Sequence, residues 1–232
     1  MKKHGKKFVE VLKNIEKDKF YTCEEAVKLV KETSITKFDG TVEIAFKLNI
    51  DSKKSDQQLR GSLVLPHGTG KDKKIVVIAK GAAAEEAKAA GADIVGDKDI
   101  LEKIKAENWF DFDVMVASPD MMPEVGKIGN ILGPRGLMPN PKVGTVTPKV
   151  ADAVKNIKSG MVAYKNDTFG NIHTIVGKVS FDDTKLVENI NYAISVIAKS
   201  KPTGVKGKFI ENITLTSTMG PGVKLEKNSF DI

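Results

Sequence analysis

Residues 75–117 read IVVIAKGAAAEEAKAAGADIVGDKDILEKIKAENWFDFDVMVA. Short apolar runs at the start, middle and end of this stretch alternate with two segments of helical composition, the first of which is rich in alanine. The order strand, helix, strand, helix, strand is typical of βαβ units, in which right-handed crossovers join parallel strands. The stretch therefore predicts an α/β block with a parallel sheet in the middle of the chain.

The regions on either side of this block have a different spacing of apolar residues. Residues 42–50 alternate apolar and polar side chains, which is typical of a strand with one buried face. Apolar residues at helical spacing in residues 8–15 and 186–197 predict amphipathic helices. Further strands are expected over residues 172–179 and 209–219, so both chain ends are of α+β type.

The simplest assembly of these parts is two domains. Residues 1–67 and 160–232 would form one discontinuous α+β domain, with residues 68–159 inserted as the α/β domain. Insertions are tolerated where two chain ends lie close together at a surface. The two chain connections between the domains, near residues 66–70 and 159–160, would also form a hinge.

The charge of the chain favours a polyanionic partner. The net charge is +7 and the pI is about 9.2. Residues 68–159 hold 14 Lys and Arg against 13 Asp and Glu, whereas the flanking regions hold 23 against 17, so +6 of the excess lies outside the insert. No apolar run reaches the length of a membrane span and the first residues are charged, so we expect a cytoplasmic protein without membrane contact.

The single cysteine, Cys23, cannot form an intrachain disulfide, which fits a reducing compartment. It follows Thr22, which forms a capping-box pattern with Glu25 and so predicts the start of a helix. We expect Cys23 to be a small packed side chain and not a nucleophile.

Two sequences that resemble nucleotide sites lack the residues that such sites need. A phosphate-binding P-loop over residues 65–72 would require glycine at Leu65 and Ser or Thr at Asp72, and the segment leads into a strand instead of a helix. A dinucleotide site over residues 80–84 would require three spaced glycines and has one. A nucleotide-using enzyme built on the α/β block is therefore the weaker alternative.

Metal and acid–base chemistry have no sequence support either. The three histidines, His4, His67 and His173, do not stand at metal-ligand spacing to one another or to the cysteine. The adjacent Asp182 and Asp183 are better explained as an N-cap and a first-turn charge than as an acid–base pair. We expect no catalytic residues, no metal and no cofactor.

Residues 129–148 read GNILGPRGLMPNPKVGTVTP, with four glycines, four prolines, two cations and no carboxylate. This density of glycine and proline predicts neither helix nor strand but an ordered, turn-rich loop with exposed backbone N–H groups. Such a loop suits an anionic polymer, although a surface connection without a partner has the same composition. The helix expected over residues 150–157 follows it and ends at Gly160.

Two further stretches contain residue types that are suited to contacts with RNA. Residues 37–41 place Phe38 between charges just before a strand, although a packed residue at a helix–strand corner would have the same pattern. Residues 214–222 form a hydroxyl-rich strand that runs into a tight turn, although an ordinary edge strand would also be rich in threonine. Hydroxyls and a glycine that admits close backbone approach match the 2′-OH edge of RNA.

The joint order of several motifs resembles one family, the bacterial large-subunit ribosomal proteins called L-one. These motifs are His4-Gly5-Lys6, Lys37-Phe38-Asp39, Ser55-Asp56-Gln57 with Arg60-Gly61, Leu65-Pro66-His67-Gly68, Gly133 to Lys142, and Ser217-Thr218-Met219-Gly220. The resemblance implies a Rossmann-like domain inserted into an α+β domain, as the periodicities also suggest.

The resemblance also implies where RNA would bind. The principal surface would lie on the terminal domain, on a corner, on a strand over residues 165–173 and on a C-terminal turn: Lys37, Phe38, Thr41, Glu43, Lys165, Asp167, His173, Ser217, Thr218, Met219 and Gly220. Hydroxyls would bond ribose and backbone, the Met and Phe side chains would pack on sugar or base, and the glycine would admit the RNA backbone. Arg135 and Lys142 would add a secondary contact, while Thr168 and Gly40 depart from the family pattern.

A family member of this kind would be a structural constituent of the large ribosomal subunit. The resemblance implies binding to ribosomal RNA in the mobile stalk, assistance in the release of exit-site tRNA, and repression of translation through the leader of its own mRNA. It also implies a monomer when the protein is free of RNA.

Overall fold

The computed structural model describes residues 5–16 and 18–226 of the chain. It divides into two compact units, one formed by Met1–Gly70 with Val162–Ile232 and the other by Lys71–Met161. Each unit has its own buried core. In the parts of the chain that the structure describes, no helix has both the length and the apolar character needed to cross a membrane.

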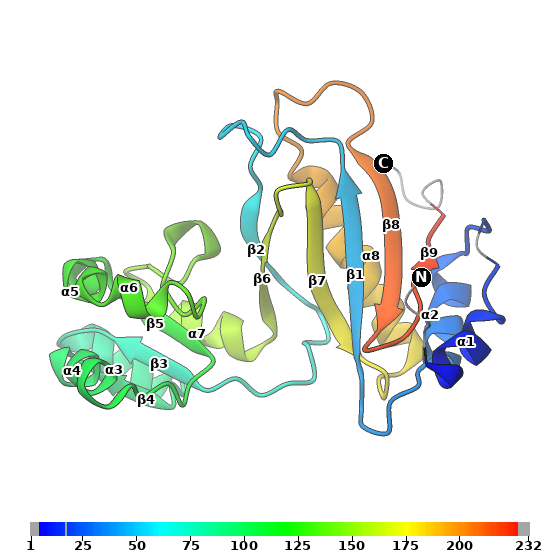
Figure 1. The fold of residues 1–232 in the computed structure, drawn as a ribbon. Coiled ribbons are helices and arrows are strands. Elements are labelled where there is room, and N and C mark those ends of the chain that lie inside the picture. Colours follow the sequence, from blue (N-terminus) through cyan, green and yellow to red (C-terminus); the bar gives the residue numbers. More distant parts are fainter. Residues whose placement is uncertain (1–4, 17, 227–232) are drawn as a thin grey trace. The chain divides into compact units, whose positions relative to one another are not determined.

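The first unit is built on an antiparallel sheet (Figure 1). Its strands are β1 (Thr41–Leu48), β7 (Asn171–Lys178), β8 (Ile210–Ser217) and β9 (Val223–Lys224), in the order β7-β1-β8-β9. Alternate residues of β1 are buried, with Phe46 among the largest of them. This confirms the strand that the alternating sequence predicted.

Two helices, α2 (Cys23–Glu32) and α8 (Asp183–Lys199), cover one face of this sheet. The other face carries exposed and half-buried side chains, and we call it the open face. The capping box of α2 is present, because the Thr22 hydroxyl accepts the Glu25 N–H at 3.4 Å and the Glu25 carboxylate accepts the Thr22 N–H at 3.2 Å. The amphipathic helix at residues 186–197 is likewise confirmed by α8. The first amphipathic segment forms α1 (Lys6–Leu12).

Cys23 packs in the core beneath α2, as the sequence predicted. Burial, with a smaller contribution from the nearby Glu24 carboxylate, raises the pKa of its thiol to about 12. The thiolate is the nucleophilic form of cysteine, so Cys23 is unreactive in the folded protein.

A second, two-stranded sheet pairs β2 (Arg60–Val64) with β6 (Met161–Lys165). The prediction that residues 165–173 form one strand is wrong. The chain turns at residues 166–170 between β6 and β7, where Gly170 adopts a φ of +78°. Two strands of different sheets, joined at the turn by one antiparallel bridge between Asn166 and Ile172, therefore stand in place of the single strand.

The second unit contains β3 (Ile75–Ile78), α3 (Ala82–Ala89), β4 (Ile94–Gly96), α4 (Lys98–Glu107) and β5 (Val114–Ala117). The three strands are parallel in the order β4-β3-β5. All four residues of β3 are buried, as expected for the central strand of a sheet with both faces covered. The βαβ prediction is confirmed.

The segment after β5 departs in part from the sequence-based expectation. It forms the 3-10 helix η1 (Pro119–Met121), α5 (Met122–Lys127), α6 (Gly129–Leu132), the 3-10 helix η2 (Pro141–Val143) and α7 (Val150–Lys158). Residues 129–148 were expected to contain no helix, but α6 forms because Leu132 is buried in the apolar core. Apart from η2, the remainder is an ordered loop, in which Gly136 and Gly144 supply positive φ values of +71° and +82°.

Candidate nucleic-acid interface

The corner before β1 is fixed by hydrogen bonds to the chain around Ser180. The Asp39 carboxylate accepts the Ser180 N–H at 3.0 Å and the Ser180 hydroxyl at 2.8 Å. On the other side of the corner, the Lys178 Nζ donates to the Thr41 hydroxyl at 3.0 Å. These bonds hold the backbone while the Phe38 ring remains 63% exposed. The alternative in which Phe38 packs into the corner is therefore wrong.

Gly40 lies inside this corner. A Cβ at this position would stand 3.2 Å from the Thr36 hydroxyl and 3.7 Å from the Thr218 Cβ, so a larger residue would crowd the turn. The Thr36 hydroxyl itself donates to the Phe38 carbonyl at 3.0 Å. The glycine that departs from the family pattern thus fits a position that neighbouring side chains crowd.

The turn after β8 is joined to the same corner through Thr218. Its backbone N–H donates to the Thr41 carbonyl at 2.9 Å, and its hydroxyl accepts the Thr41 N–H at 2.9 Å. These bonds extend the β1–β8 pairing by one position beyond Val42 and Ser217. Thr218, expected to contact ribose, therefore also ties two strands together.

Ser217 and Gly220 fit one another. The Ser217 side chain is buried, and its Oγ has no hydrogen-bond partner among the described residues. A Cβ at Gly220 would stand only 2.3 Å from that Oγ. Gly220 therefore makes room for Ser217, and the Ser217 hydroxyl is closed to solvent in this conformation.

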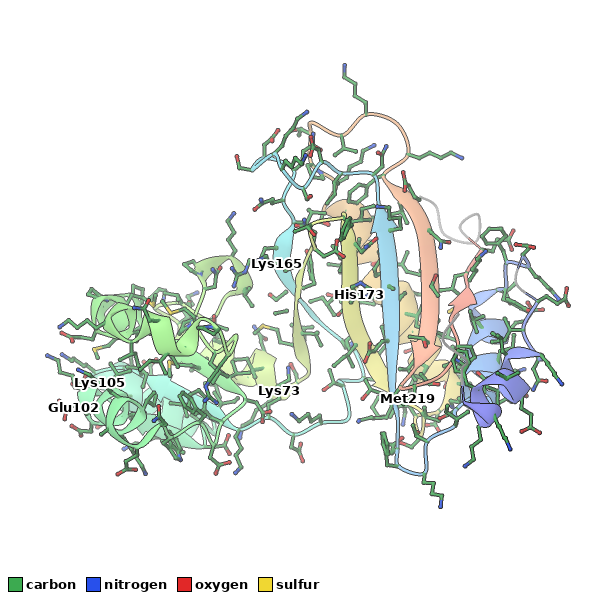
Figure 2. All side chains as sticks on the ribbon, viewed as in Figure 1. Lys73, Glu102, Lys105, Lys165, His173 and Met219 are labelled. Atoms are coloured by element: carbon green, nitrogen blue, oxygen red, sulfur yellow. The ribbon has the colours of Figure 1, made fainter. Side chains whose placement is uncertain are left out.

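Met219 stands outward between these residues (Figure 2). It adopts a φ of +64°, which is uncommon for a residue other than glycine, and its side chain is 72% exposed. A depression of about 540 Å³ beside it is lined by Gly5, Lys6, Lys7, Phe8, Ile35 and Met219. A single exposed apolar side chain is common on protein surfaces. At Met219, however, the exposed side chain is carried by a strained backbone, and such strain is often found at functional sites.

The hydroxyl-rich strand is not an ordinary edge strand. β8 pairs with β1 along its length and with β9 at Thr214 and Leu215. On the open face, Ala45 of β1 lies between His173 of β7 and Thr214 of β8. Glu43, two residues earlier, shares this face and is exposed. Figure 2 shows His173 on β7.

Asp167 organises the β6–β7 turn. Its Oδ1 accepts the backbone N–H groups of Phe169 and Asn171, both at 2.8 Å, and its Oδ2 accepts the Asn171 side-chain amide at 2.9 Å. The backbone hydrogen bond from Asn171 contributes most to lowering the pKa of Asp167, against an opposing effect of burial. Asp167 therefore positions the turn, while Lys165 before it is exposed.

The two residues expected to form a secondary contact lie in the second unit, and both are exposed. The Arg135 guanidinium lies 3.8 Å from the centroid of the Phe110 ring, which is within range of a cation–π contact. The backbone N–H of Lys142 donates to the Asn140 side chain at 2.9 Å. The ring thus orients the Arg135 guanidinium, while the capped turn fixes only the backbone of Lys142.

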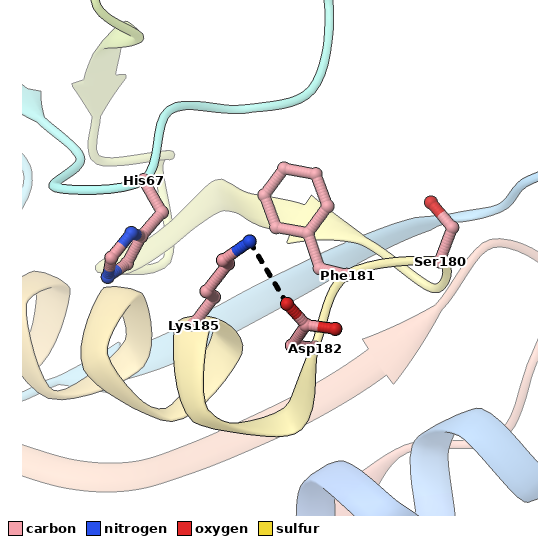
Figure 3. Close-up of a pocket in the computed structure, with 5 residues that line it drawn as sticks. All are labelled: His67, Ser180, Phe181, Asp182 and Lys185. Atoms are coloured by element: carbon pink, nitrogen blue, oxygen red, sulfur yellow. Dashed lines mark ion pairs between the residues drawn. The ribbon is translucent and has the colours of Figure 1, made fainter.

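A depression of about 250 Å³ at the start of α8 is lined by His67, Ser180, Phe181, Asp182 and Lys185 (Figure 3). Its polar groups have partners within the chain: Lys185 forms an ion pair with Asp182 at 3.0 Å, and the His67 Nε2 lies 2.5 Å from the Glu188 carboxylate. Asp182 stands at the N-cap as predicted, but its carboxylate makes no cap hydrogen bond. Asp183, in the first turn, pairs with Lys31 at 2.5 Å.

The depression therefore holds an ion pair, a histidine in contact with a carboxylate, and the Ser180 hydroxyl, which donates to Asp39. Among residues 5–16 and 18–226, no three His, Cys, Asp or Glu side chains are grouped so that they could hold a metal ion. The chemically distinctive surface of the first unit is instead the exposed Phe38 and Met219 at one end of the β1–β8 pair, beside the open face. An arrangement of this kind is suited to contacts with sugar and base.

The sequence model of the ribosomal protein L1p/L10e family matches residues 30–221, which is more than half of the chain. The chain therefore belongs to this family. It is a structural constituent of the large ribosomal subunit that binds ribosomal RNA, and it is not an enzyme. The alternative of a nucleotide-using enzyme on the α/β block is wrong.

The structure brings some of the expected RNA-binding residues together and separates others. Lys37, Phe38 and Thr41 share one end of the β1–β8 pair with residues 217–220. The turn that contains Asp167 lies past the opposite end of β1, because Lys47 pairs with Asn171 there. Sequence reasoning did not single out Phe169 in that turn, and its only signal was a lone aromatic residue beside glycine.

Proposed function

We propose that this chain is a bacterial L-one protein of the ribosomal stalk, and that its principal RNA surface lies on the terminal domain formed by residues 1–67 and 160–232. The residues proposed to contact RNA are Lys37, Phe38, Thr41, Glu43, Lys165, His173, Thr218 and Met219, with Asp167, Ser217 and Gly220 in supporting roles. Arg135 and Lys142 provide a weaker contact from the inserted domain, residues 68–159.

One observation carries this proposal. The double hydrogen bond between Thr218 and Thr41 fixes the ends of two strands, and the neighbouring Phe38 and Met219 side chains are exposed beside it. Exposing two large apolar side chains on fixed backbone has no benefit for folding. It favours binding, because little conformational entropy remains to be lost when a base or sugar packs against them.

The proposal includes two regulatory roles that the resemblance suggests. The protein assists release of exit-site tRNA from the stalk, and it represses translation by binding the leader of its own mRNA. A leader that folds like the stalk RNA would present the same 2′-OH edge to the same residues. Competition between a leader transcript and a stalk transcript for one site is the expected result, and simultaneous binding of both would contradict it.

The proposal is tested by comparing three ligands and two proteins. The ligands are a stalk ribosomal RNA fragment, its DNA copy and an unrelated RNA hairpin; the proteins are the full chain and residues 1–67 joined to 160–232. We expect the joined terminal domain to retain most of the affinity for the stalk RNA, since the flanking regions carry +6 of the +7 charge. The DNA copy should bind much more weakly, because it lacks the 2′-OH groups.

The salt dependence of RNA affinity distinguishes recognition of RNA shape from nonspecific attraction between charges. If the lysines attract nucleic acid only through their charge, a plot of log affinity against log salt concentration should have a slope of about −0.9 per neutralised phosphate, for any nucleic acid. We expect a substantial part of the affinity for stalk RNA to persist at high salt. Equal affinity and equal salt slope for the RNA and the DNA copy would overturn the proposed site.

A further inference from the structure

Phe169 has the most exposed large hydrophobic side chain among the described residues, at 75%. It lies in the turn at residues 166–170, past the end of β1 that is remote from Phe38. Lys47, near the end of β1, donates from its Nζ to the Phe169 carbonyl at 2.5 Å. The ring therefore stands at the opposite end of the open face from the Phe38 and Met219 pair.

The turn that carries Phe169 is fixed on several sides. The Asp167 carboxylate accepts the Phe169 N–H, and the Ser52 hydroxyl donates to the Thr168 carbonyl. The Gly170 carbonyl accepts the Leu48 N–H at 2.9 Å, and a Cβ at Gly170 would stand 3.0 Å from the Leu48 carbonyl oxygen. These contacts fix the backbone of the turn, whereas the Phe169 ring does not pack in the core. A fixed backbone with an exposed side chain is preorganised, which lowers the entropic cost of binding.

Two further segments lie near this turn, and Figure 1 shows all three together beyond the end of β1. Residues 47–58 contact the turn through Ser52, and they contact residues 200–208 through the Asn49 side chain, which donates to the Lys208 carbonyl at 3.2 Å. We call the exposed surface of these three segments, 47–58, 166–170 and 200–208, the basic loop face.

The basic loop face has an excess of positive charge. It carries Lys47, Lys53, Lys54, Lys201, Lys206 and Lys208 against Asp51, Asp56 and Asp167. All of these lysines except Lys47 are exposed. Lys54 pairs with Asp51 at 3.9 Å, and six lysines against three carboxylates leave a net charge of +3 on these segments. Lys47 donates to the Phe169 carbonyl, and Lys201 donates to the Gly207 carbonyl at 2.8 Å. An exposed aromatic ring among exposed cations is the combination that binds unpaired nucleotides.

We infer that the basic loop face is a second RNA contact of the terminal domain, which stacks an unpaired nucleobase on Phe169 and places the adjoining phosphates against the lysines. This inference rests on the proposed function, since it assumes that the terminal domain binds RNA. It extends the proposed RNA surface, which already includes Lys165 and Asp167 near this turn, to a stacking position on Phe169 and to the lysines of the neighbouring loops. Base stacking on an aromatic ring tolerates any base, so this subsite contributes affinity more than sequence preference.

The test uses the full chain and a stalk ribosomal RNA transcript in which unpaired adenines are replaced, one at a time, by 2-aminopurine. We expect one position to be quenched by the wild type and by Phe169→Trp but not by Phe169→Ala. The affinity of Phe169→Ala should fall about tenfold, as for the loss of one stacked base. Tyr192→Ala, which removes another exposed aromatic ring from α8 on the covered side of the sheet, should leave both readouts unchanged.

Phe38→Ala keeps the inference and the proposed function distinguishable. If Phe38→Ala weakens binding while Phe169→Ala binds within about twofold of wild type and quenches every position normally, the basic loop face is not an RNA contact and the proposed function stands. If neither variant weakens binding, the proposed function falls as well. Preferential capture of an acidic protein by this face, with RNA affinity unchanged in Phe169→Ala, would also overturn the inference.

Discussion

The hydroxyl of Thr218 accepts the backbone N–H of Thr41 at 2.9 Å, while the Thr218 N–H donates to the Thr41 carbonyl at the same distance. One residue thus continues the β1–β8 pairing with both its backbone and its side chain. The hydroxyl that resemblance assigns to ribose is therefore already used by the fold. It can contact RNA only while it also holds the corner that presents Phe38.

Replacing Thr218 with alanine should lower the free energy of unfolding by about 1 kcal/mol, because the Thr41 N–H loses its acceptor. Thr218→Ser keeps the hydroxyl and should retain most of this stability. Urea unfolding of the three proteins measures the difference. Affinity for stalk RNA should fall severalfold in Thr218→Ala, and wild-type stability in that variant would show that the hydrogen bond contributes nothing to folding.

Ser217 and Gly220 form a pair that a double-mutant cycle can measure. Gly220→Ala should destabilise the protein, since the new Cβ would stand 2.3 Å from the Ser217 Oγ. Ser217→Ala alone should be neutral or stabilising, because the hydroxyl is buried and has no hydrogen-bond partner among the described residues.

The double variant Ser217→Ala/Gly220→Ala removes the clashing atom and should recover a large part of the stability lost in Gly220→Ala. Thermal unfolding of the four proteins gives the coupling energy. Strictly additive effects would show that the two residues do not share space in solution. If Ser217→Ala binds stalk RNA like the wild type, the role of Ser217 is to shape the turn.

Sequence periodicity predicted the main sheets because β1 alternates over eight residues and the βαβ order repeats within residues 75–117. It missed β2 and β6, which have five residues each and no sustained alternation. The single strand over residues 165–173 was implied by the resemblance and not by periodicity, and a turn set by the hydrogen bonds of a single carboxylate has no periodic signature that could have corrected it.

The candidate site was predictable in identity but not in role. Motif resemblance pointed to residues 217–220, yet only three-dimensional contacts show that Thr218 binds Thr41 and that Gly220 accommodates Ser217. These contacts join residues distant in sequence or depend on a turn geometry, and no pattern in a single sequence encodes either. Phe169 was missed for the same reason, since its significance comes from the loops around it.

Cys23 should react slowly with Ellman's reagent at about pH 8 in the folded protein and rapidly in denaturant. Burial raises the pKa of its thiol to about 12, whereas an exposed cysteine has a pKa of about 8.5. Very little thiolate is therefore present in the folded state. The absorbance of released thionitrobenzoate measures both rates, and equal rates would show that the start of α2 opens readily.

The β6–β7 turn should lose order in acid. The folded-state pKa of Asp167 lies below its unfolded value of about 3.9, so its stabilising effect is complete above that value and is lost as the pH falls through the folded-state pKa. Amide NMR signals of Phe169 and Asn171 should titrate together with a midpoint below 3.9. Asp167→Asn should abolish this titration, and a midpoint at or above about 4 would contradict the hydrogen-bonded turn.

Met219→Gly should separate stability from RNA binding. The φ of +64° at Met219 strains a side-chain-bearing residue but not glycine, so the variant should unfold with a free energy unchanged or raised by up to about 1 kcal/mol. Because the exposed side chain is lost, affinity for stalk RNA should nevertheless fall severalfold. Met219→Ala is the matched control, since it loses the same contact but keeps the strain, and it should be the less stable of the two. Denaturant unfolding and filter binding measure the two quantities; retained RNA affinity in both variants would remove Met219 from the proposed interface.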